Sequence, residues 1–360
     1  MLHWLALLFL FGFSFCSAQS HCTVLGHATG FADSTLLLLS DASSSQVIDS
    51  AYILNGKFTL KSPVADKALE VVLSTVDHRD YKFFWMESNT TLTFKGEKGK
   101  FKNAAVTGAK TQNEANLLEN SINPVKDKRD SLYQLFYADT TAKARDLLYP
   151  KFKELDKQEE AVYQSFIREY SGSLVSANVL NIYKTTWAFD TVKVLFTLLS
   201  PENKQSEYGK QTAAFIAVYK NVKAGDRYAD FTLPDTAGKK ISLSDFKGKV
   251  VLVEFWASWC YGCIQTNPAL VKVYNEFSPK GFEVIGVSLD KDRASWIKAI
   301  QKDSLSFTNL SDLKGDQNTA ALIYGISAIP DNILIDRNGI VIARNLTAKE
   351  LTNRLRQLCN

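Results

Sequence analysis

The sequence predicts a multidomain protein in which an N-terminal antiparallel β-sandwich and a helical middle segment precede a C-terminal α/β domain. Two changes of pattern indicate this fold class. Short β-branched and aromatic runs give way near residue 109 to a segment dominated by Lys, Glu, Gln, Leu and Ala, and from residue 225 apolar strands alternate with helices. At about 100 to 200 residues per domain, 360 residues accommodate this arrangement. We expect a leader at 1–18 and domains at 19–108, 109–224 and 225–360.

The leader has the features of a secretory signal peptide. An apolar stretch at 2–15 is followed by small residues at 16–18 and then by polar Gln19, as a signal peptidase requires. The stretch is shorter than the roughly 20 residues of a membrane span, but an uncleaved anchor is the alternative because no Lys or Arg precedes it. Phe15 stands directly before Cys16, where a lipid-anchored protein needs a small residue, so no lipid anchor is expected. We expect a mature chain in the periplasm or cell envelope, where disulfides persist.

The β segment shows six short runs rich in β-branched, leucine and aromatic residues, separated by turn residues. Asn55-Gly56 joins two of these runs and predicts a type I′ hairpin, because both residues tolerate the positive φ that this turn requires. No catalytic motif falls within the segment. The expected strands are Thr35–Leu39, Val47–Leu54, Phe58–Leu60, Ala68–Thr75, Tyr81–Glu87 and Thr91–Phe94.

The middle segment contains only two glycines, Gly172 and Gly209, and its composition favours helices. Apolar residues at helical spacing line one side of an expected helix. Pro150 is expected in the first turn of that helix, where its missing N–H costs little. We interpret the stripe as packing against neighbouring helices rather than as a ligand groove. Its members are Leu148, Phe152, Leu155, Val162, Phe166 and Tyr170.

The C-terminal segment alternates strands and helices, which predicts a central sheet covered on both faces. A hairpin is expected around Asp235–Gly238 and a second one through Asn338-Gly339. The expected strands are Val250–Phe255, Phe282–Asp290, Asn332–Asp336 and Ile340–Ala343, and the expected helices are Cys260–Phe277, Arg293–Gln301, Thr319–Tyr324 and Ala348–Leu358.

Composition argues against some classes of function. The 42 Lys and Arg against 38 Asp and Glu leave a net charge of +4, and no basic run is present, so nucleic acid is not an expected partner. The last of the four histidines is His78. Chemistry in the C-terminal domain therefore has to proceed without imidazole.

Cys260 and Cys263 carry the strongest functional signal. They stand three residues apart where a strand passes into a helix, so the first cysteine is expected at a helix N-terminus. Free backbone N–H groups and the positive end of the helix dipole stabilise a thiolate there and lower its pKa. We expect Cys260 to attack a disulfide and Cys263, one turn further on, to resolve the mixed disulfide.

Glu254 is the candidate proton acceptor for the second attack. It lies in the apolar strand six residues before Cys260, and strand alternation could aim its carboxylate under Cys263. The alternative is an ordinary carboxylate at a strand end, with water or a lysine as its partner.

These residues resemble the thioredoxin superfamily, and more closely its exported TlpA and ResA-like thiol-disulfide oxidoreductases, from about residue 225 to the C-terminus. The resemblance implies a thioredoxin fold, a redox-active Cys260–Cys263 disulfide in place of any cofactor or metal, and protein disulfides as substrates. It also implies a membrane thiol-transfer protein as reductant and, for members of this kind, roles such as cytochrome c maturation. The substrate-binding residues that it implies are Trp259, Tyr261, Gly262, Ile329 and Pro330, the last as a cis-proline.

Two positions depart from the family pattern. Tyr261-Gly262 stands where the family often has Gly-Pro or Glu-Pro, so the redox potential and the direction of electron flow cannot be carried over. Thr266 stands where ResA-like members have a glutamate. The segments before residue 225 loosely resemble the poorly characterised module that often precedes TlpA-like domains in exported proteins of Gram-negative bacteria.

Three other interpretations compete with this one. A zinc site needs four ligands, and only Cys22 and Cys359 are left to join the pair. A peroxiredoxin-like thiol peroxidase shares the fold, but Val253 and Ala257 stand where that class has a proline and a threonine. A non-catalytic partner-binding protein with a structural disulfide is the third. Whether Cys22 and Cys359 pair, and in which oligomeric state the chain exists, stay open.

Overall fold

The computed structural model describes residues 20–64, 68–139 and 141–359 of the chain. The expected signal peptide, its cleavage site and Cys16 lie outside the described residues. The described chain forms two compact units. One runs to Tyr163 and includes Ser173–Val175, and the other comprises Gln164–Gly172 and the chain from Ser176 onward. Among the described residues, no helix has both the length and the apolar character that crossing a bilayer requires.

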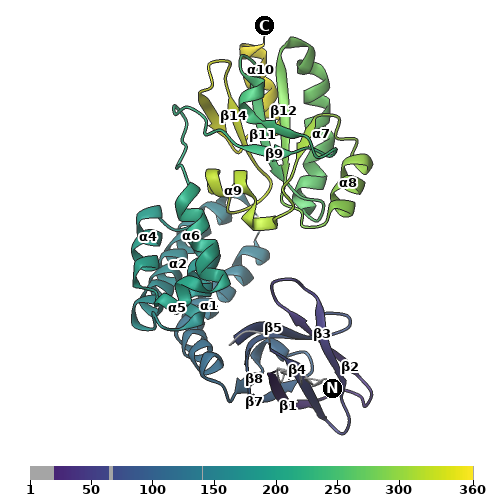
Figure 1. The fold of residues 1–360 in the computed structure, drawn as a ribbon, viewed down its shortest axis with the longest axis vertical. Coiled ribbons are helices and arrows are strands. Elements are labelled where there is room, and N and C mark those ends of the chain that lie inside the picture. Colours follow the sequence, from purple (N-terminus) through teal and green to yellow (C-terminus); the bar gives the residue numbers. More distant parts are fainter. Residues whose placement is uncertain (1–19, 65–67, 140, 360) are drawn as a thin grey trace, which may run out of the picture. The chain divides into compact units, whose positions relative to one another are not determined.

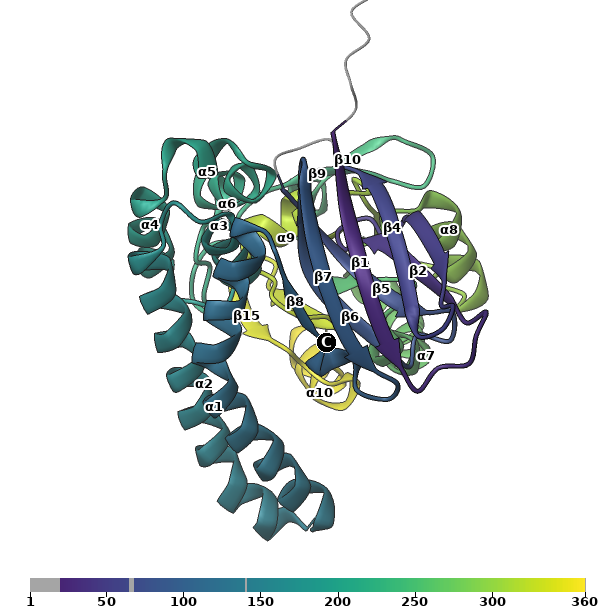
Figure 2. The ribbon, with the colours of Figure 1, turned by 90° about the horizontal axis from the view of Figure 1, so that it is seen from below.

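The first unit contains a β-sandwich of two four-stranded sheets (Figure 2). Sheet A has the strand order β4-β1-β7-β8 and sheet B the order β3-β2-β5-β6. Neighbouring strands are antiparallel except β1 and β7, which run parallel. Sheet A consists of β1 (His21–Thr29), β4 (Lys57–Pro63), β7 (Thr90–Glu97) and β8 (Ala105–Thr107), and sheet B of β2 (Leu36–Asp41), β3 (Val47–Tyr52), β5 (Ala68–Thr75) and β6 (Tyr81–Glu87).

In β1 and β4 every second residue is buried in the core of the sandwich, whereas β6 buries three consecutive residues, Phe84–Met86. Side chains of both sheets meet in one apolar cluster, in which the ring of Phe84 on β6 lies 6.2 Å from that of Phe94 on β7. The turn before β4 has positive φ at Asn55 and Gly56, as predicted. The six predicted strands are present, but β1 and β8 were not predicted. Gly26 interrupts the alternation of β1, and a Cβ there would lie 2.1 Å from the Phe58 ring.

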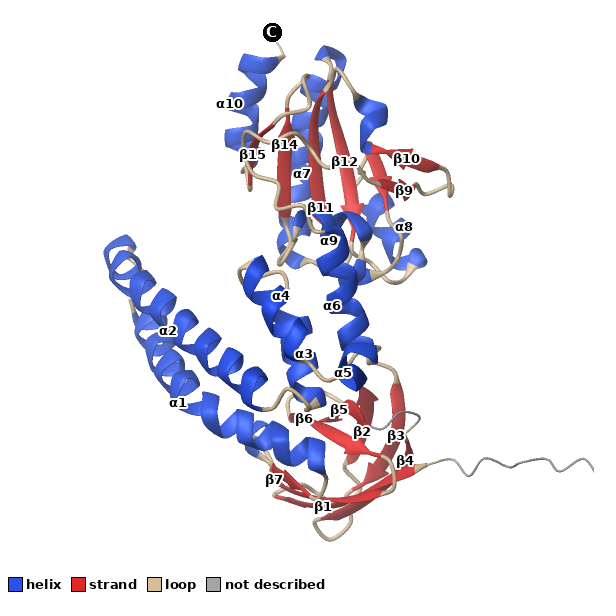
Figure 3. Cartoon of the chain, turned by 60° about the vertical axis from the view of Figure 1, so that its left-hand side comes forward, coloured by secondary structure: helices blue, strands red, loops and turns tan. Residues whose placement is uncertain are grey.

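The middle of the chain is helical, as predicted. Arg129 of α1 joins the first two helices through Asp156 at 2.9 Å and Glu159 at 2.7 Å, so they run side by side as a hairpin (Figure 3). The expectation for Pro150 was wrong: it lies well inside α2, because the good helix formers before it start the helix at Ala142. The helices are α1 (Lys110–Ala138), α2 (Ala142–Glu169), α3 (Leu174–Tyr183), α4 (Phe189–Leu198), α5 (Pro201–Gln205) and α6 (Glu207–Val218).

The C-terminal part of the second unit is built on a five-stranded sheet with the order β13-β12-β11-β14-β15 (Figure 1). The strands β11, β12 and β13 are parallel, and β14 and β15 are antiparallel to their neighbours. The edge strand β13, only three residues long, was not predicted. The elements are β9 (Thr232–Pro234), β10 (Lys240–Ser242), β11 (Val250–Trp256), α7 (Tyr261–Phe277), β12 (Phe282–Ser288), α8 (Arg293–Lys302), β13 (Thr308–Leu310), α9 (Thr319–Tyr324), β14 (Asp331–Ile335), β15 (Val341–Arg344) and α10 (Ala348–Leu358).

The central strand β11 positions the site. All of its residues are buried, because helices cover both faces of the sheet: α9 lies on one side and α7 on the other (Figure 3). The ring of Phe255 lies 6.2 Å from that of Tyr324 in α9. Side chains alternate along a strand, so the neighbouring Glu254 points to the side of α7.

Candidate active site

Cys260 and Cys263 form a disulfide at the start of α7, with an S–S distance of 2.03 Å and a Cα–Cα distance of 5.2 Å. Cys260 is the N-cap residue of the helix, and its Sγ accepts a hydrogen bond from the backbone N–H of Cys263 at 3.1 Å. This is one of the N–H groups that a helix leaves without an internal partner. Once the disulfide is reduced, the same N–H is available to stabilise a thiolate on Cys260.

The two cysteines differ in their access to solvent. Cys263 is completely buried, whereas Cys260 keeps 6% of its surface exposed. Two large aromatic residues flank Cys260 and stand in solvent, Trp259 with 66% and Tyr261 with 76% of their surfaces exposed. An incoming disulfide can therefore approach Cys260 and not Cys263.

The loop before β14 lies against the cysteine pair. The Ile329–Pro330 peptide bond is cis, and Pro330 is exposed while Ile329 is half-buried. A Cβ added to Gly262 would lie 3.2 Å from Cδ of Pro330. The structure thus brings together Gly262, between the cysteines, and a proline far along the chain.

Glu254 is a carboxyl group in the interior of the sheet. It lies on β11 opposite Asn332 of β14 and is 6% exposed. Burial raises the pKa of Glu254 to about 8, a hydrogen bond with the Asn332 side chain lowers it, and the charge of Asp331 raises it. The carboxyl group can therefore take up or release a proton near neutral pH.

Asp331 and Arg344 form an ion pair directly after the cis-proline. Nη2 of Arg344 lies 2.7 Å from Oδ2 of Asp331, and Nε donates to both carboxylate oxygens. Asp331 pairs with Phe255 across the sheet, so its side chain and that of Glu254 project from opposite faces. The guanidinium group partly compensates the negative charge that faces β11.

A buried network holds the loop in front of Cys260, and it was not predicted. Asp290 is 1% exposed and accepts hydrogen bonds from the N–H of Ser258 at 3.0 Å, from its hydroxyl at 2.6 Å, and from the hydroxyl of Ser288 at 2.7 Å. The sequence feature that could have indicated this network is Asp290 itself, an acid that closely follows the apolar strand β12. Its partner Ser258 lies two residues before Cys260, so Asp290 fixes the backbone that presents the sulfur.

The structure also shows the surroundings of the residues on which the competing interpretations depend. Val253 and Ala257 are both fully buried among apolar groups. The hydroxyl of Thr266 donates back to the carbonyl groups of Gly262 and Cys263 in its own helix. Cys22 and Cys359 are buried free thiols in different compact units. Burial raises the pKa of both thiols, which disfavours the reactive thiolate.

Two known protein families match two separate parts of this chain. Residues 224–344 match the AhpC/TSA family. Residues 22–115 match a domain of unknown function, DUF4369. The first match contains both cysteines, Glu254 and Pro330, and the second contains the β-sandwich.

Individual proteins resemble the C-terminal part. The thiol-disulfide oxidoreductase ResA of Bacillus thuringiensis subsp. konkukian is 32% identical over 121 residues, which cover 34% of this chain and 68% of that protein. ResA of B. thuringiensis strain Al Hakam is 29% identical over 147 residues, 40% of this chain and 83% of the relative. A crystal structure of the thioredoxin domain of a Bacteroides vulgatus thiol-disulfide oxidoreductase is 36% identical, covers 39% of this chain and 99% of its own, and has a TM-score of 0.37.

Proposed function

This chain belongs to the ResA-like thiol-disulfide oxidoreductases of the thioredoxin superfamily, and we propose that it is an exported enzyme that reduces disulfide bonds in proteins. The observation that carries this function is the asymmetry of the Cys260–Cys263 pair at the start of α7. One sulfur has an N–H donor at 3.1 Å and residual exposure, and the other is sealed. This is what a nucleophile and its resolving thiol require.

In the proposed reaction the reduced Cys260 thiolate attacks one sulfur of a substrate disulfide. A bond forms between Cys260 and that sulfur, and the other substrate sulfur leaves as a thiolate that takes up a proton. Cys263 then loses its proton and attacks Sγ of Cys260. The second substrate sulfur is released, and the Cys260–Cys263 disulfide forms. Two electrons pass to the substrate, and no cofactor is needed.

Glu254 is the proposed proton acceptor for Cys263. The neighbouring Phe255 points toward Tyr324 of α9, so Glu254 points to the opposite side of the sheet, and its pKa of about 8 lies near the ordinary pKa of a thiol. Proton transfer between groups of similar pKa is efficient in either direction. The same carboxyl group could return the proton when the enzyme is reduced again.

Substrate contact is proposed at the exposed rim of the pair. Trp259 and Tyr261 offer aromatic surface on the two sides of Cys260. Gly262 lacks the Cβ that would press on Pro330, so the proline and Ile329 can present backbone to a substrate segment. We propose residues 225–360 as the catalytic domain, 19–108 as a β-sandwich domain and 109–224 as a helical linker domain.

The predicted signal peptide supports a place in the periplasm or cell envelope. An enzyme that reduces disulfides there has to be reduced itself, which we assign to a membrane protein that passes thiol electrons outward. The direction of electron flow rests on the potential of the pair. Reference values are about −270 mV for thioredoxin and about −120 mV for the oxidant DsbA.

A trapping experiment tests the assignment. In Cys263→Ser, substrates should stay attached to Cys260 as mixed disulfides, visible as bands on non-reducing gels and identified by mass spectrometry. Cys260→Ser is the matched control and should trap nothing. Adducts on Cys260→Ser instead would reverse the two roles.

Two assays separate the competing functions. The full mature chain should catalyse reduction of insulin disulfides with a potential near that of thioredoxin, and Cys260→Ser should lose this activity. A potential near that of DsbA would make the protein an oxidant. Peroxide consumption that depends on Cys260 would favour the thiol peroxidase, and an inert disulfide would favour the partner-binding protein.

A further inference from the structure

The two sheets of the β-sandwich carry opposite charge. The strands of sheet B contain four acids and one lysine, and those of sheet A contain three lysines, two histidines and one acid. The charged residues of sheet B are Asp41, Asp49, Glu70, Lys82 and Glu87. Those of sheet A are Lys57, Lys61, Lys95 and Glu97, with His21 and His27.

Charges of sheet B serve the fold. Asp41 holds the turn after β2, where its carboxylate accepts the N–H of Ser43 at 2.8 Å. Glu87 accepts the N–H of Thr111 at 2.6 Å, in the first turn of α1, where a carboxylate is favoured by the helix dipole. These carboxylates are therefore explained by structure alone.

The lysines of sheet A have no such role. Lys57, Lys61 and Lys95 are exposed, and within the described residues none of them has a hydrogen bond or ion pair to another side chain. The one acid of the sheet, Glu97, is held by Lys100 at 3.1 Å. Among the described residues, no acid therefore pairs with the lysines of this face.

The register of the strands aligns two of these lysines with a histidine. Lys57 of β4 is directly opposite His27 of β1, which is directly opposite Lys95 of β7. Neighbouring strands lie about 4.8 Å apart, so Lys57 and Lys95 project from the same face of the sheet on the two sides of His27. A row of exposed basic side chains that pairs with no acid among the described residues offers an anion several positive groups on one face.

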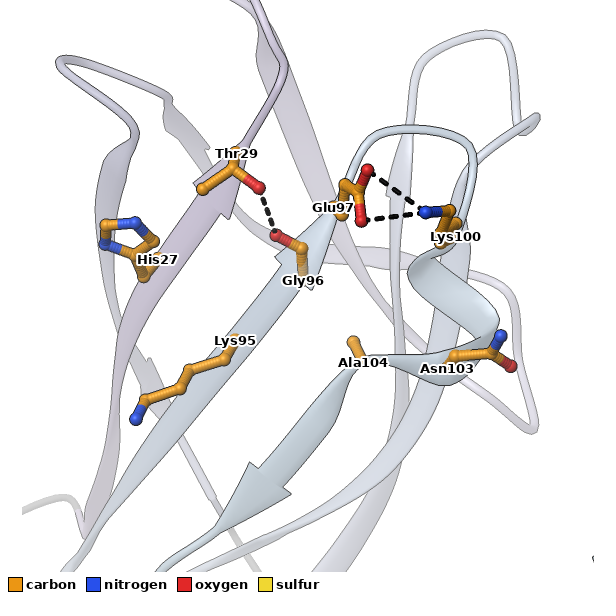
Figure 4. Close-up of a pocket in the computed structure, with 8 residues that line it drawn as sticks. All are labelled: His27, Thr29, Lys95, Gly96, Glu97, Lys100, Asn103 and Ala104. Carbon is orange, nitrogen blue, oxygen red and sulfur yellow. Dashed lines mark hydrogen bonds and ion pairs between the residues drawn. The ribbon is translucent and has the colours of Figure 1, made fainter.

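A hollow adjoins the row. It measures about 590 Å³ and is lined by residues of β1, β7 and the short helix at Phe101–Asn103. Figure 4 shows His27 and Lys95 projecting from neighbouring strands on one side of it and the Glu97–Lys100 pair on the other. The hollow gives the row a place where a ligand can be held from more than one direction.

We propose that the outer face of sheet A binds an acidic saccharide, a sugar chain that carries carboxylate, sulfate or phosphate groups. The lysines alternate with hydroxyl groups that can both donate and accept hydrogen bonds, as sugar hydroxyls require. One row across the sheet reads Thr59, Leu25, Thr93 and Thr107.

The composition of the face disfavours two other anionic partners. Peptide recognition relies on large apolar anchors, and Leu25 is the only large apolar residue exposed on the described strands of this face. Proteins that bind a membrane surface commonly insert aromatic or other large apolar groups, and the described strands of this face expose no aromatic residue.

The test is a binding measurement on the full mature chain with polygalacturonate as the probe and neutral dextran as its uncharged counterpart. We expect salt-sensitive binding to polygalacturonate and none to dextran. The triple variant K57Q/K61Q/K95Q should bind about tenfold more weakly or worse. The control K126Q/K128Q/K151Q removes the same charge from exposed lysines of the helical hairpin and should bind as the native chain does.

Equal weakening in both triple variants would overturn the proposal, because the effect would then be one of net charge. Preferential binding to poly-glutamate, or to vesicles of phosphatidylglycerol, would overturn it in favour of an acidic peptide or a lipid surface. The insulin reduction rate should be unchanged in both variants, since none of the six lysines belongs to the cysteine site. Failure here therefore leaves the proposed redox function standing.

Discussion

Glu254 and the lysines of sheet A are ionisable groups that form no ion pair among the described residues, and their surroundings treat them in opposite ways. Glu254 is 6% exposed in the middle of a sheet, so its carboxylate form is poorly solvated and its pKa rises to about 8. The lysines stand in water, where like charges are screened. Burial therefore makes the Glu254 carboxyl group able to exchange a proton near neutral pH, whereas exposure keeps the lysines charged and accessible to a ligand.

The largest predicted effect is on the pH dependence of stability, and its absence would contradict the comparison. The folded chain keeps the Glu254 proton up to a pH of about 8, whereas the unfolded chain releases it near the ordinary value of 4.5. The free energy of unfolding therefore falls as pH rises through this window, by an amount on the order of 4 to 5 kcal/mol. Glu254→Gln should remove that loss, so the variant should match the native chain at pH 4 and exceed it at pH 9.

Urea unfolding at a series of pH values measures this difference. The lysine variant K57Q/K61Q/K95Q is the control, because surface changes of this kind move stability by about 0.5 kcal/mol or less each, and its difference from the native chain should not depend on Glu254. A Glu254→Gln difference that stayed flat between pH 4 and pH 9 would show that the carboxyl group titrates normally.

The next effect is on catalysis. Glu254→Gln should slow insulin reduction by about a hundredfold, the usual contribution of a positioned acid or base. The loss should fall on resolution, so mixed disulfides on Cys260 should persist in the variant, as they do in Cys263→Ser. Glu283→Gln is the matched control, since Glu283 lies on the neighbouring strand and pairs with Lys249 at 3.1 Å. Equal rates in the two variants would remove Glu254 from the mechanism.

The smallest predicted effect concerns Asp290, a buried carboxylate that, unlike Glu254, accepts several hydrogen bonds. Asp290→Asn keeps the size of the side chain but replaces one acceptor with a donor, opposite hydroxyl and N–H donors of Ser258 and Ser288. We expect roughly 1 to 3 kcal/mol of lost stability and about a tenfold lower rate of attack by Cys260. Alkylation kinetics of the reduced protein measure the second quantity. An unchanged alkylation rate would make Asp290 a purely structural residue.

Most of the α/β domain could be predicted because its signals are local. The apolar run of β11, the Cys260 position at a helix start and the Asn338-Gly339 turn each depend on a few neighbouring residues. The strand β1 was missed because Gly26 breaks its alternation, and the reason for that glycine is the ring of Phe58 on another strand. Asn332 and Asp290 were missed for the same reason, since their partners are distant in sequence.

By itself, the sequence determined the reactive group, which is a pair of cysteines one helical turn apart. The first of them stands at the helix start, where backbone N–H groups lack partners within the helix. Backbone geometry within a single turn is enough for that chemistry. Only the tertiary structure decided which sulfur is accessible, that Pro330 meets Gly262, that Glu254 faces Asn332, and that two lysines and a histidine align across three strands. The sulfur accessibility and the Gly262–Pro330 contact depend on how distant segments pack, and the other two depend on strand register, where a slip of one residue would turn the side chains to the other face.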